Sequence, residues 1–316
     1  MTSGAPRPGP APADRLPANG LLLLVALTFF WGGNWPALKL AVGEIPIWTL
    51  RTICLFGGGL GLLLLARLSH ATIRIPRADL GPLLLVTLFN IIGWHLCSAY
   101  GVSLMPAGRA AIIAFTMPLW AAVLSPLILK ERLTPAKLGG LVTGLCGIAV
   151  LIGPDIAALQ TAPVGGLFML LAAMSWAGGT VGLKRFDWGL PTTALIGWQL
   201  VLGGIPVALG AVWLEDPDAI TGISTTAALA TLYIVVFPIL FCHWGYATLV
   251  RLFPAVVAAT GTLAIPVVGV FGSAAVLGEP VGLRELAALA LVCAALFWVL
   301  IWPALAARAA SRVGPG

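Results

Sequence analysis

Two histidines, one arginine and one glutamine lie inside long apolar runs of this 316-residue chain, where polar side chains are rare. His95 and His243 either form polar steps of a passage that titrates near neutral pH, or each pairs with a backbone carbonyl at a helix contact. Arg51 lies about one turn inside its run. Its charge either reaches the nearby water interface or faces inward and meets the carboxylate of a bound molecule. Gln199 is expected to line the same interior.

Aromatic residues also sit deep in these runs. The deep set comprises Trp31, Trp94, Trp176, Trp198 and Trp244, while Tyr100 and Tyr246 lie nearer the run ends. A buried indole needs a hydrogen-bond partner or a hydrated cavity. The set therefore either packs in the core and against lipid, or forms a broad, weakly selective wall for apolar and aromatic groups.

The stretch "TFFWGGNWPALKLAV" (28–42) concentrates such residues. Trp31, Asn34 and Trp35 recur at three- and four-residue spacing, so a helix places them on one face. Pro36 has no backbone N–H and frees the carbonyl one turn earlier, which predicts a bend or a polar group offered to a cavity. This face is the expected determinant of selectivity.

The elements that position these residues must be membrane helices. Hydrophobic residues make up 60% of the chain and charged residues 9%, whereas a soluble domain carries roughly 25% charged residues. Inside lipid every backbone polar group needs an internal partner, so an apolar run as long as the bilayer core is expected to be a helix. Ten runs qualify, at residues 20–42, 47–67, 80–102, 107–129, 136–153, 163–184, 191–214, 226–249, 255–277 and 284–303.

The basic residues predict the orientation of these helices. With a cytoplasmic N-terminus, 13 of the 17 Lys and Arg residues fall on the cytoplasmic side and three on the other, with Arg51 set aside. This bias predicts a multi-pass protein of the bacterial inner membrane with both termini in the cytoplasm. Residues 1–19 and 304–316 are then cytoplasmic tails. The basic residues form no patch typical of nucleic-acid binding.

The two halves of the chain resemble each other at two constant offsets. The matched pairs are Trp31–Trp176, Lys39–Lys184 and Pro46–Pro191 at 145 residues, and His95–His243, Pro106–Pro254, Pro118–Pro266 and Glu131–Glu279 at 148 residues. Because each half has five runs, the second copy must enter the membrane inverted, an architecture associated with alternating access. The expected fold is an all-α integral membrane protein of ten helices, in which inverted repeats 20–153 and 154–303 surround a central cavity. Pro36, Pro118 and Pro266 are the predicted hinges.

Three segments resemble a known family. "AAIIAFTMPLWAAVLSPLILKERLTPAKLGGLVTGLCGIAVLIG" (110–153) and "AATGTLAIPVVGVFGSAAVLGEPVGLRELAALALVCAALFWVL" (258–300) are similar to the end of an EamA repeat, and "FWGGNWPALK" resembles its entry. The resemblance implies the drug/metabolite transporter superfamily in its ten-helix form. Within it, the chain is most similar to YddG-type exporters of aromatic and other amino acids. The function this implies is export of aromatic and other neutral amino acids by alternating access.

Enzymatic and metal-binding functions find less support in the residues. No hydrolase, zinc, nucleotide or dinucleotide motif stands in a fitting context, so no enzyme activity, cofactor or metal site is expected. The five cysteines lie in apolar runs without metal-ligand spacing, which is typical of small buried residues. All eleven acidic residues fall in loops or at helix ends, which predicts a facilitative or weakly coupled carrier of a net-neutral substrate.

Two alternatives stay open: a carrier of other small metabolites, such as sugars, nucleotide precursors or drugs, and a membrane enzyme. A phosphorylated substrate would need several cations in the cavity, and only Arg51, Lys39 and Arg109 come near it. The glycine-rich run "FGGGLGLLLL" (56–65) predicts close helix packing. The expected partners are amino acids and the lipid bilayer, without nucleic acid, and the chain is expected to act as a monomer.

Overall fold

The secondary structure that the computed structural model describes is entirely helical. The description covers residues 18–130, 135–152, 162–216, 221–246, 264–298, 302 and 305. In chain order its elements are α1 (Ala18–Gly32), α2 (Asn34–Val42), α3 (Ile47–Leu68), η1 (Arg77–Asp79), α4 (Leu80–Thr87), η2 (Leu88–Gly93), α5 (Trp94–Leu104), α6 (Ala107–Ala114), α7 (Met117–Leu129), α8 (Pro135–Ile152), α9 (Ala162–Arg185), α10 (Thr192–Leu214), α11 (Thr225–Ile234), η5 (Val235–Phe241), α14 (Ala264–Leu277) and α15 (Leu283–Leu296).

Six of the described helical stretches are long and apolar enough to cross a membrane. They run over Ile47–Leu68, Arg77–Leu104, Ala107–Leu129, Val164–Arg185, Thr192–Leu214 and Thr225–Tyr246, and two shorter apolar helices cover Leu138–Gly147 and Ala264–Leu277. Each coincides with a run expected from the sequence. The prediction of a multi-pass, all-helical membrane protein is confirmed.

The first expected helix, 20–42, is divided into α1 and α2 at Gly33. This is the place where the ring of Pro36 removes the N–H that would have paired with the carbonyl of Gly32. The chain keeps helical hydrogen bonds around the turn, since the N–H of Gly33 donates to the Phe29 carbonyl at 2.8 Å. A bend predicted from Pro36 is therefore present, and motion at this bend stays a prediction.

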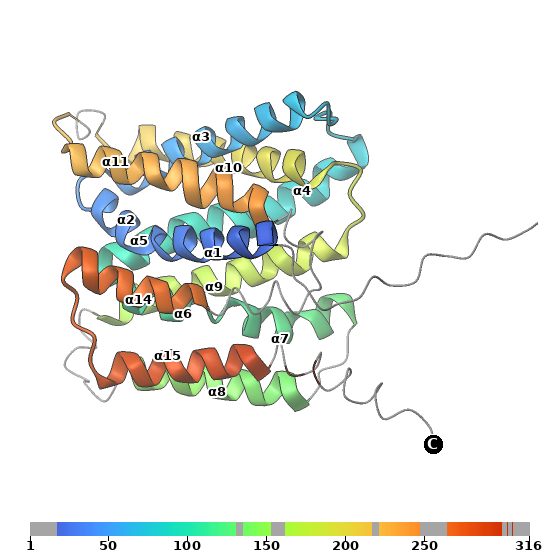
Figure 1. The fold of residues 1–316 in the computed structure, drawn as a ribbon. Helices are drawn as coiled ribbons and strands as arrows, with labels where there is room; N and C mark the ends of the chain where they lie inside the picture. The colour runs from blue at the N-terminus through green and yellow to red at the C-terminus, as the bar shows by residue number, and fades with distance from the viewer. Residues whose placement is uncertain are drawn as a thin grey trace, which may run out of the picture.

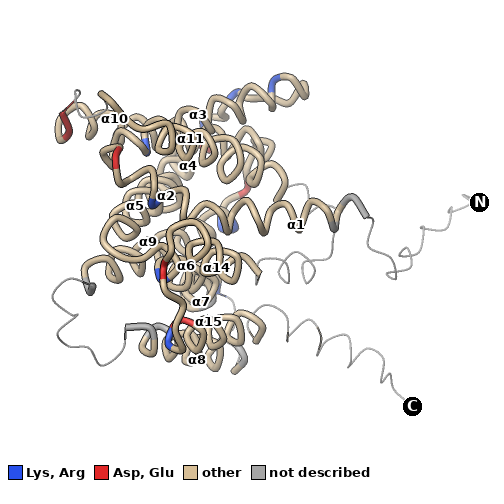
Figure 2. The backbone as a smooth tube through the Cα atoms, turned by 60° about the vertical axis from the view of Figure 1, so that its left-hand side comes forward, with Lys and Arg blue, Asp and Glu red and all other residues tan. Residues whose placement is uncertain are grey.

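Helices from opposite halves of the chain pack together at two sides of the bundle (Figure 1). On one side α3 packs against α10, and on the other α8 packs against α15. The helices α1, α2, α5, α6, α9 and α14 lie between these two pairs. Most described charged residues are at the ends of the helices (Figure 2), as expected for spans whose middles face lipid or the core.

At the glycines of the run 56–65, side chains of the neighbouring helices lie close to the backbone of α3. The contacting pairs are Gly57 with Val235, Gly58 with Ile239, Gly59 with Leu200 and Val201, and Gly61 with Leu240. A side chain at these positions would enter space that α10 and η5 already fill. The predicted role of this run in close helix packing is confirmed.

Two π-helical turns lie at equivalent positions in the two halves. Adding the repeat offset of 148 to η2 gives residues 236–241, which fall inside η5. Each turn ends two residues before a histidine, His95 or His243. Inside η5, Pro238 lacks a donor N–H and so displaces the hydrogen-bond ladder. Such turns are rare and frequently occur at functional sites.

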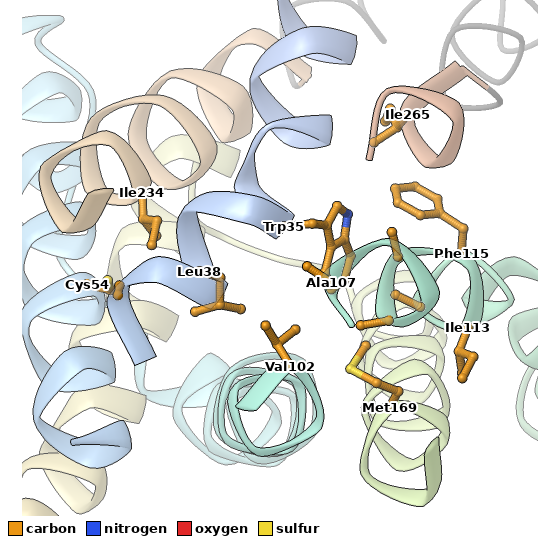
Figure 3. Close-up of a cluster of buried hydrophobic side chains, with 14 of the residues drawn as sticks. Trp35, Leu38, Cys54, Val102, Ala107, Ile113, Phe115, Met169, Ile234 and Ile265 are labelled. Carbon is orange, nitrogen blue, oxygen red and sulfur yellow. The ribbon is translucent and has the colours of Figure 1, made fainter. Parts of the chain in front are cut away.

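The main hydrophobic core includes the region where α2, α5, α6, α9 and α14 meet (Figure 3), and it extends to buried residues of α3, α10, α11 and α15. Trp35 and Leu38 of α2, Val102 of α5, Ile113 of α6 and Met169 of α9 are buried there. This region lies among the helices that carry half of the predicted site residues.

Candidate functional site

Trp35 lies in the middle of a chain of aromatic rings contributed by four parts of the fold. Its ring stands edge-on to Trp94 of α5, with 6.5 Å between centroids, and edge-on to Phe115 at 6.4 Å. Trp94 in turn contacts the ring of Trp176 in α9 at 4.9 Å. Trp35 is 3% exposed, whereas Trp94 and Trp176 are half-buried. The three predicted tryptophans thus meet, and Phe115, which follows α6, joins them.

Trp31, one turn before Trp35, belongs to a second aromatic group. Its ring lies 6.2 Å from His243, edge-on, and 5.6 Å from Tyr246. Its indole N–H donates to the carbonyl oxygen of Pro238 in the π turn η5, at 3.1 Å. Three predicted residues are again together. Gly33 lies between the two aromatic groups, because Trp31 is in α1 and Trp35 is in α2.

The two predicted histidines have different surroundings. His243 Nδ1 lies 2.6 Å from the carbonyl oxygen of Ile239, which is the backbone pairing considered as one alternative. His95 is 5% exposed, and neither of its ring nitrogens has a hydrogen-bond partner among the described residues. A buried polar group without a partner is costly unless water or a ligand completes it. His95 is therefore the stronger candidate for a ligand contact.

Arg51 is 2% exposed and does not reach an interface. Its Nε donates to the backbone carbonyl of His95 at 2.8 Å, and its Nη2 donates to the Ser98 hydroxyl at 2.9 Å. No described acidic residue forms an ion pair with it. The alternative in which its charge reaches the interface is wrong for this structure. A buried cation without a described acidic partner inside a membrane span makes Arg51 a candidate for a substrate contact.

Gln199 of α10 belongs to a second cluster of buried polar side chains, together with Thr87 of α4 and Asn90 of η2. Its Oε1 accepts a hydrogen bond from Asn90 Nδ2 at 3.2 Å. Among the described residues, Asn90 Oδ1, Gln199 Nε2 and the hydroxyl of Thr87 have no partner. Asn90, Thr87 and Ser98 were not predicted from the sequence. Asn90 could have been, because an asparagine in the middle of an apolar run is rare.

Three predicted residues lie away from the central aromatic rings. The Trp198 indole N–H donates to the carbonyl of Ile73 at 2.6 Å, in the segment that leads to α4. Tyr100 accepts a hydrogen bond from the Trp48 indole at 2.9 Å, near the C-terminal end of α5. Trp244 is 43% exposed and contacts the ring of Phe241. These positions favour anchoring and packing roles for all three.

The remaining predicted residues are in α2, α7 and α14. Asn34 is half-buried at the first position of α2, and Pro36 is buried two residues later. Pro118 is the second residue of α7, directly after the break at Phe115 and Thr116 that separates α6 from α7. Pro266 is buried in the first turn of α14. The helices are therefore interrupted near Pro36 and Pro118, and the hinge roles of the three prolines stay predictions.

An apolar groove of about 730 Å³ lies between α1, α2, α11 and α14. Its lining includes Phe29, Leu229, Tyr233, Val268 and Phe271. Among the described lining residues, Pro36 alone belongs to the predicted site set. The predicted aromatic and polar residues thus form a site separate from this groove.

The arrangement combines aromatic faces with one buried cation and neutral polar atoms. Trp94 supplies a ring to the aromatic chain, and the next residue, His95, offers its carbonyl to Arg51. These residue types are the ones that suit an apolar or aromatic side chain beside a carboxylate. Within the described ranges, no three His, Cys, Asp or Glu residues are grouped as metal ligands would be.

Comparisons with known proteins place the chain among transporters. The model of the EamA-like transporter family matches residues 18–153 and 163–301. The uncharacterised transporter YvbV of Bacillus subtilis is 32% identical over 274 residues, which cover 86% of this chain and 88% of YvbV. A Salmonella typhimurium protein named "probable amino-acid metabolite efflux pump" is 27% identical, over 88% of this chain and 93% of that protein.

Two further comparisons concern substrate and fold. The aromatic amino acid exporter YddG of Ancylobacter novellus is 28% identical over 180 residues, which cover 54% of this chain and 61% of YddG. A solved crystal structure shares the fold with a TM-score of 0.65 at 19% identity, over 89% of this chain and 96% of that one. With two matched family regions that together cover most of its length, the chain belongs to the EamA-like transporter family, within the drug/metabolite transporter superfamily.

Proposed function

We propose that this chain exports aromatic and other neutral amino acids by alternating access between two inverted five-helix repeats. The observation that carries the proposal is Arg51, a buried cation without a described acidic partner, held at the backbone of the residue next to Trp94. A free amino acid brings the missing carboxylate, and its side chain would lie against the aromatic rings. Relatives named as an amino-acid efflux pump and an aromatic amino acid exporter support the same substrate class.

The two matched family regions and the two equivalent π turns support the inverted repeat. Two halves that bend at the same place but face opposite ways exchange conformations at modest cost, so that one site opens to either side. In this scheme the ten helices comprise five from each half. No enzymatic step is part of the proposal.

The test is counterflow in proteoliposomes with a panel of labelled neutral amino acids. Phenylalanine, tryptophan, leucine and alanine should exchange against the same unlabelled compound inside, and protein-free liposomes should show no exchange. Phenethylamine, which has the phenylalanine side chain without the carboxylate, should exchange poorly because Arg51 loses its partner. If no neutral amino acid exchanges, the proposed substrate class is wrong.

A second candidate substrate class is favoured by the apolar groove. Its wall of Phe29, Leu229 and Phe271 fits a drug-like or other apolar compound better than a charged metabolite. The same liposomes separate the two classes, since an uncharged drug-like compound would then exchange while phenylalanine would not.

We also propose the bacterial inner membrane as the location, with both termini in the cytoplasm. The distribution of Lys and Arg supports this orientation. A green fluorescent protein fused at the C-terminus should fluoresce, and alkaline phosphatase fused at the same place should be inactive. The opposite pattern would reverse the orientation.

A further inference from the structure

The turn at Pro106, between α5 and α6, is held by a lysine from another helix. Lys39 Nζ of α2 donates to the carbonyl oxygens of Val102 at 2.7 Å, Ser103 at 3.2 Å and Met105 at 3.0 Å. These carbonyls lie at and just beyond the C-terminal end of α5, where helix carbonyls have no partner within the helix. A cation there also complements the negative end of the helix dipole.

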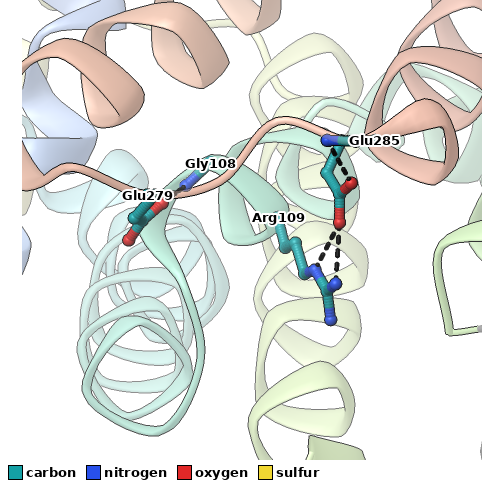
Figure 4. Close-up of polar contacts among 5 residues, drawn as sticks. Gly108, Arg109, Glu279 and Glu285 are labelled. Atoms are coloured by element: carbon teal, nitrogen blue, oxygen red, sulfur yellow. Dashed lines mark hydrogen bonds and ion pairs between the residues drawn. The ribbon is translucent and has the colours of Figure 1, made fainter.

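A glutamate from the other half of the chain holds the opposite side of the same turn. The carboxylate of Glu279, which follows α14, accepts the N–H of Ala107 at 2.7 Å and the N–H of Gly108 at 2.9 Å (Figure 4). These are the first N–H groups of α6. The N-cap residue of α6 is Pro106, which provides no side-chain cap. The cap of α6 thus comes from a residue about 170 positions away in the chain.

The contacts join the two family-matched regions. Lys39 and the Pro106 turn belong to the first region, and Glu279 belongs to the second. Beside them, Arg109 of α6 forms an ion pair of 2.7 Å with Glu285 of α15 (Figure 4).

Side chains close the bundle directly beneath these contacts. A Cβ at Gly269 of α14 would lie 2.9 Å from Ala111 of α6 and 2.9 Å from the indole of Trp35. One turn along α14, Ser273 is fully buried and faces Gly108. The aromatic chain around Trp35 is therefore closed off along the α6–α14 contact at this end of the bundle.

We propose that Lys39 and Glu279 are the gating residues of transport at the Pro106 end. Their contacts with the turn stabilise the state in which α6 and α14 are in contact, and they release when that contact opens. The inference rests on the alternating access proposed above. Water replaces the lost hydrogen bonds when the contact opens, so the switch needs only a modest free energy. The lysine and the glutamate bind helix ends rather than substrate.

The first test measures opening without any substrate. Ser273→Cys is a nearly isosteric reporter, fully buried in the closed contact. In lipid nanodiscs its alkylation rate, read by mass spectrometry of the labelled peptide, should rise about tenfold when Lys39→Met or Glu279→Gln is added, because the charge-assisted bonds of the closed state are lost.

The matched control is Glu215→Gln. Glu215 caps α3 in the same way, accepting the N–H groups of Trp48 and Thr49 at 2.8 Å each, but at the α3–α10 contact. The Glu215→Gln variant should lower the unfolding temperature without changing the alkylation rate of the cysteine in Ser273→Cys. An unchanged rate in Lys39→Met and Glu279→Gln, or an equal rise in Glu215→Gln, would overturn the proposal.

The second test fixes the contact shut. A Cβ at position 108 would lie 3.7 Å from the Cβ of Ser273, close to the ~3.8 Å of a disulfide. Oxidised Gly108→Cys/Ser273→Cys protein should lose counterflow and regain it with reductant. Full counterflow while cross-linked would refute the gate. If the natural chain shows no counterflow, the proposed substrate is wrong. The alkylation test uses no substrate, so it still tests whether Lys39 and Glu279 hold the contact closed.

Discussion

Arg51 is the residue on which the proposed substrate class depends most directly. Arg51→Met should reduce counterflow by roughly 10- to 100-fold, because a charge-assisted bond to the substrate carboxylate is lost. Arg51→Lys should keep part of the activity, since the charge remains but the planar fork does not. The unfolding temperature of Arg51→Met should stay equal or rise, because a buried cation without a described acidic partner is removed. A fall in stability that matches the fall in counterflow would make Arg51 a structural residue.

Trp31 connects α1 to the π turn of η5, and its replacement tests whether this contact serves transport. Trp31→Ala should reduce counterflow more than it reduces the yield of folded protein. Trp31→Phe should be intermediate, since it keeps a ring beside His243 and Tyr246 but loses the hydrogen bond to the Pro238 carbonyl. Equal losses of counterflow and yield in Trp31→Ala would indicate packing alone.

At the residue scale, the sequence predicted which side chains are buried better than it predicted which neighbours they contact. His95 and Gln199 were predicted to be inside the bundle, and both are buried. For Arg51 the sequence left open whether the charge reaches the interface or faces inward, and the structure buries it. Trp198 was also predicted to be deep, but its indole turns to the carbonyl of Ile73. The rotation of a side chain about its own helix depends on neighbours that the local sequence does not contain.

Among the helices, the glycine run of α3 sets how closely α3, α10 and η5 approach. Gly58→Ala should lower the free energy of unfolding by about 1–3 kcal/mol, because its Cβ overlaps Ile239. Gly81→Ala in α4 is the matched control. Its Cβ meets nothing within 4 Å, and alanine favours a helix by up to about 1 kcal/mol. Thermal unfolding in detergent measures both variants, and equal stabilities would show that the run does not set the contact.

The cap of α11 should make stability depend on pH. Hydrogen bonds from the Ser224 hydroxyl (2.6 Å) and from its backbone N–H (2.7 Å) hold the pKa of the Glu44 carboxyl below its ordinary value. The folded state therefore favours the ionised form. This stabilisation is fully present above the ordinary carboxyl pKa and is lost as pH falls through the lowered folded pKa.

The matched variant for this cap is Glu44→Gln, which cannot ionise. The unfolding temperature of the natural chain should exceed that of Glu44→Gln near neutral pH, and the difference should shrink below about pH 5. A difference that stays constant with pH would assign the effect to hydrogen bonding without charge.

At the scale of the whole molecule, the placement of acidic groups bears on energy coupling. The described acidic residues lie in loops, at helix ends or in a first helical turn, and Glu285 is in the first turn of α15. No described carboxylate lies in the middle of a span. Counterflow and efflux of the substrate should therefore proceed in liposomes without a pH gradient. Strict dependence on a gradient would contradict a facilitative carrier and would direct attention to His95.

The sequence by itself determined the class of protein and its family. Composition decides the class, because a chain with 9% charged residues cannot cover itself for water, and a helix is the form in which a single apolar run satisfies its backbone in lipid. The matched offsets and the EamA-like segments then indicated a transporter with two related halves, and the family match agrees.

Only the tertiary structure decided which side chains meet. Trp35 joins Trp94 and Trp176, while the Trp31 ring turns to His243 and Tyr246, and Asn90 pairs with Gln199 across two helices. In water, the alternation of apolar and polar residues marks the inner face of a helix. A helix in lipid is apolar on every face, so that pattern is absent. Its inner face is set by close packing and by a few polar groups that find partners from distant parts of the chain.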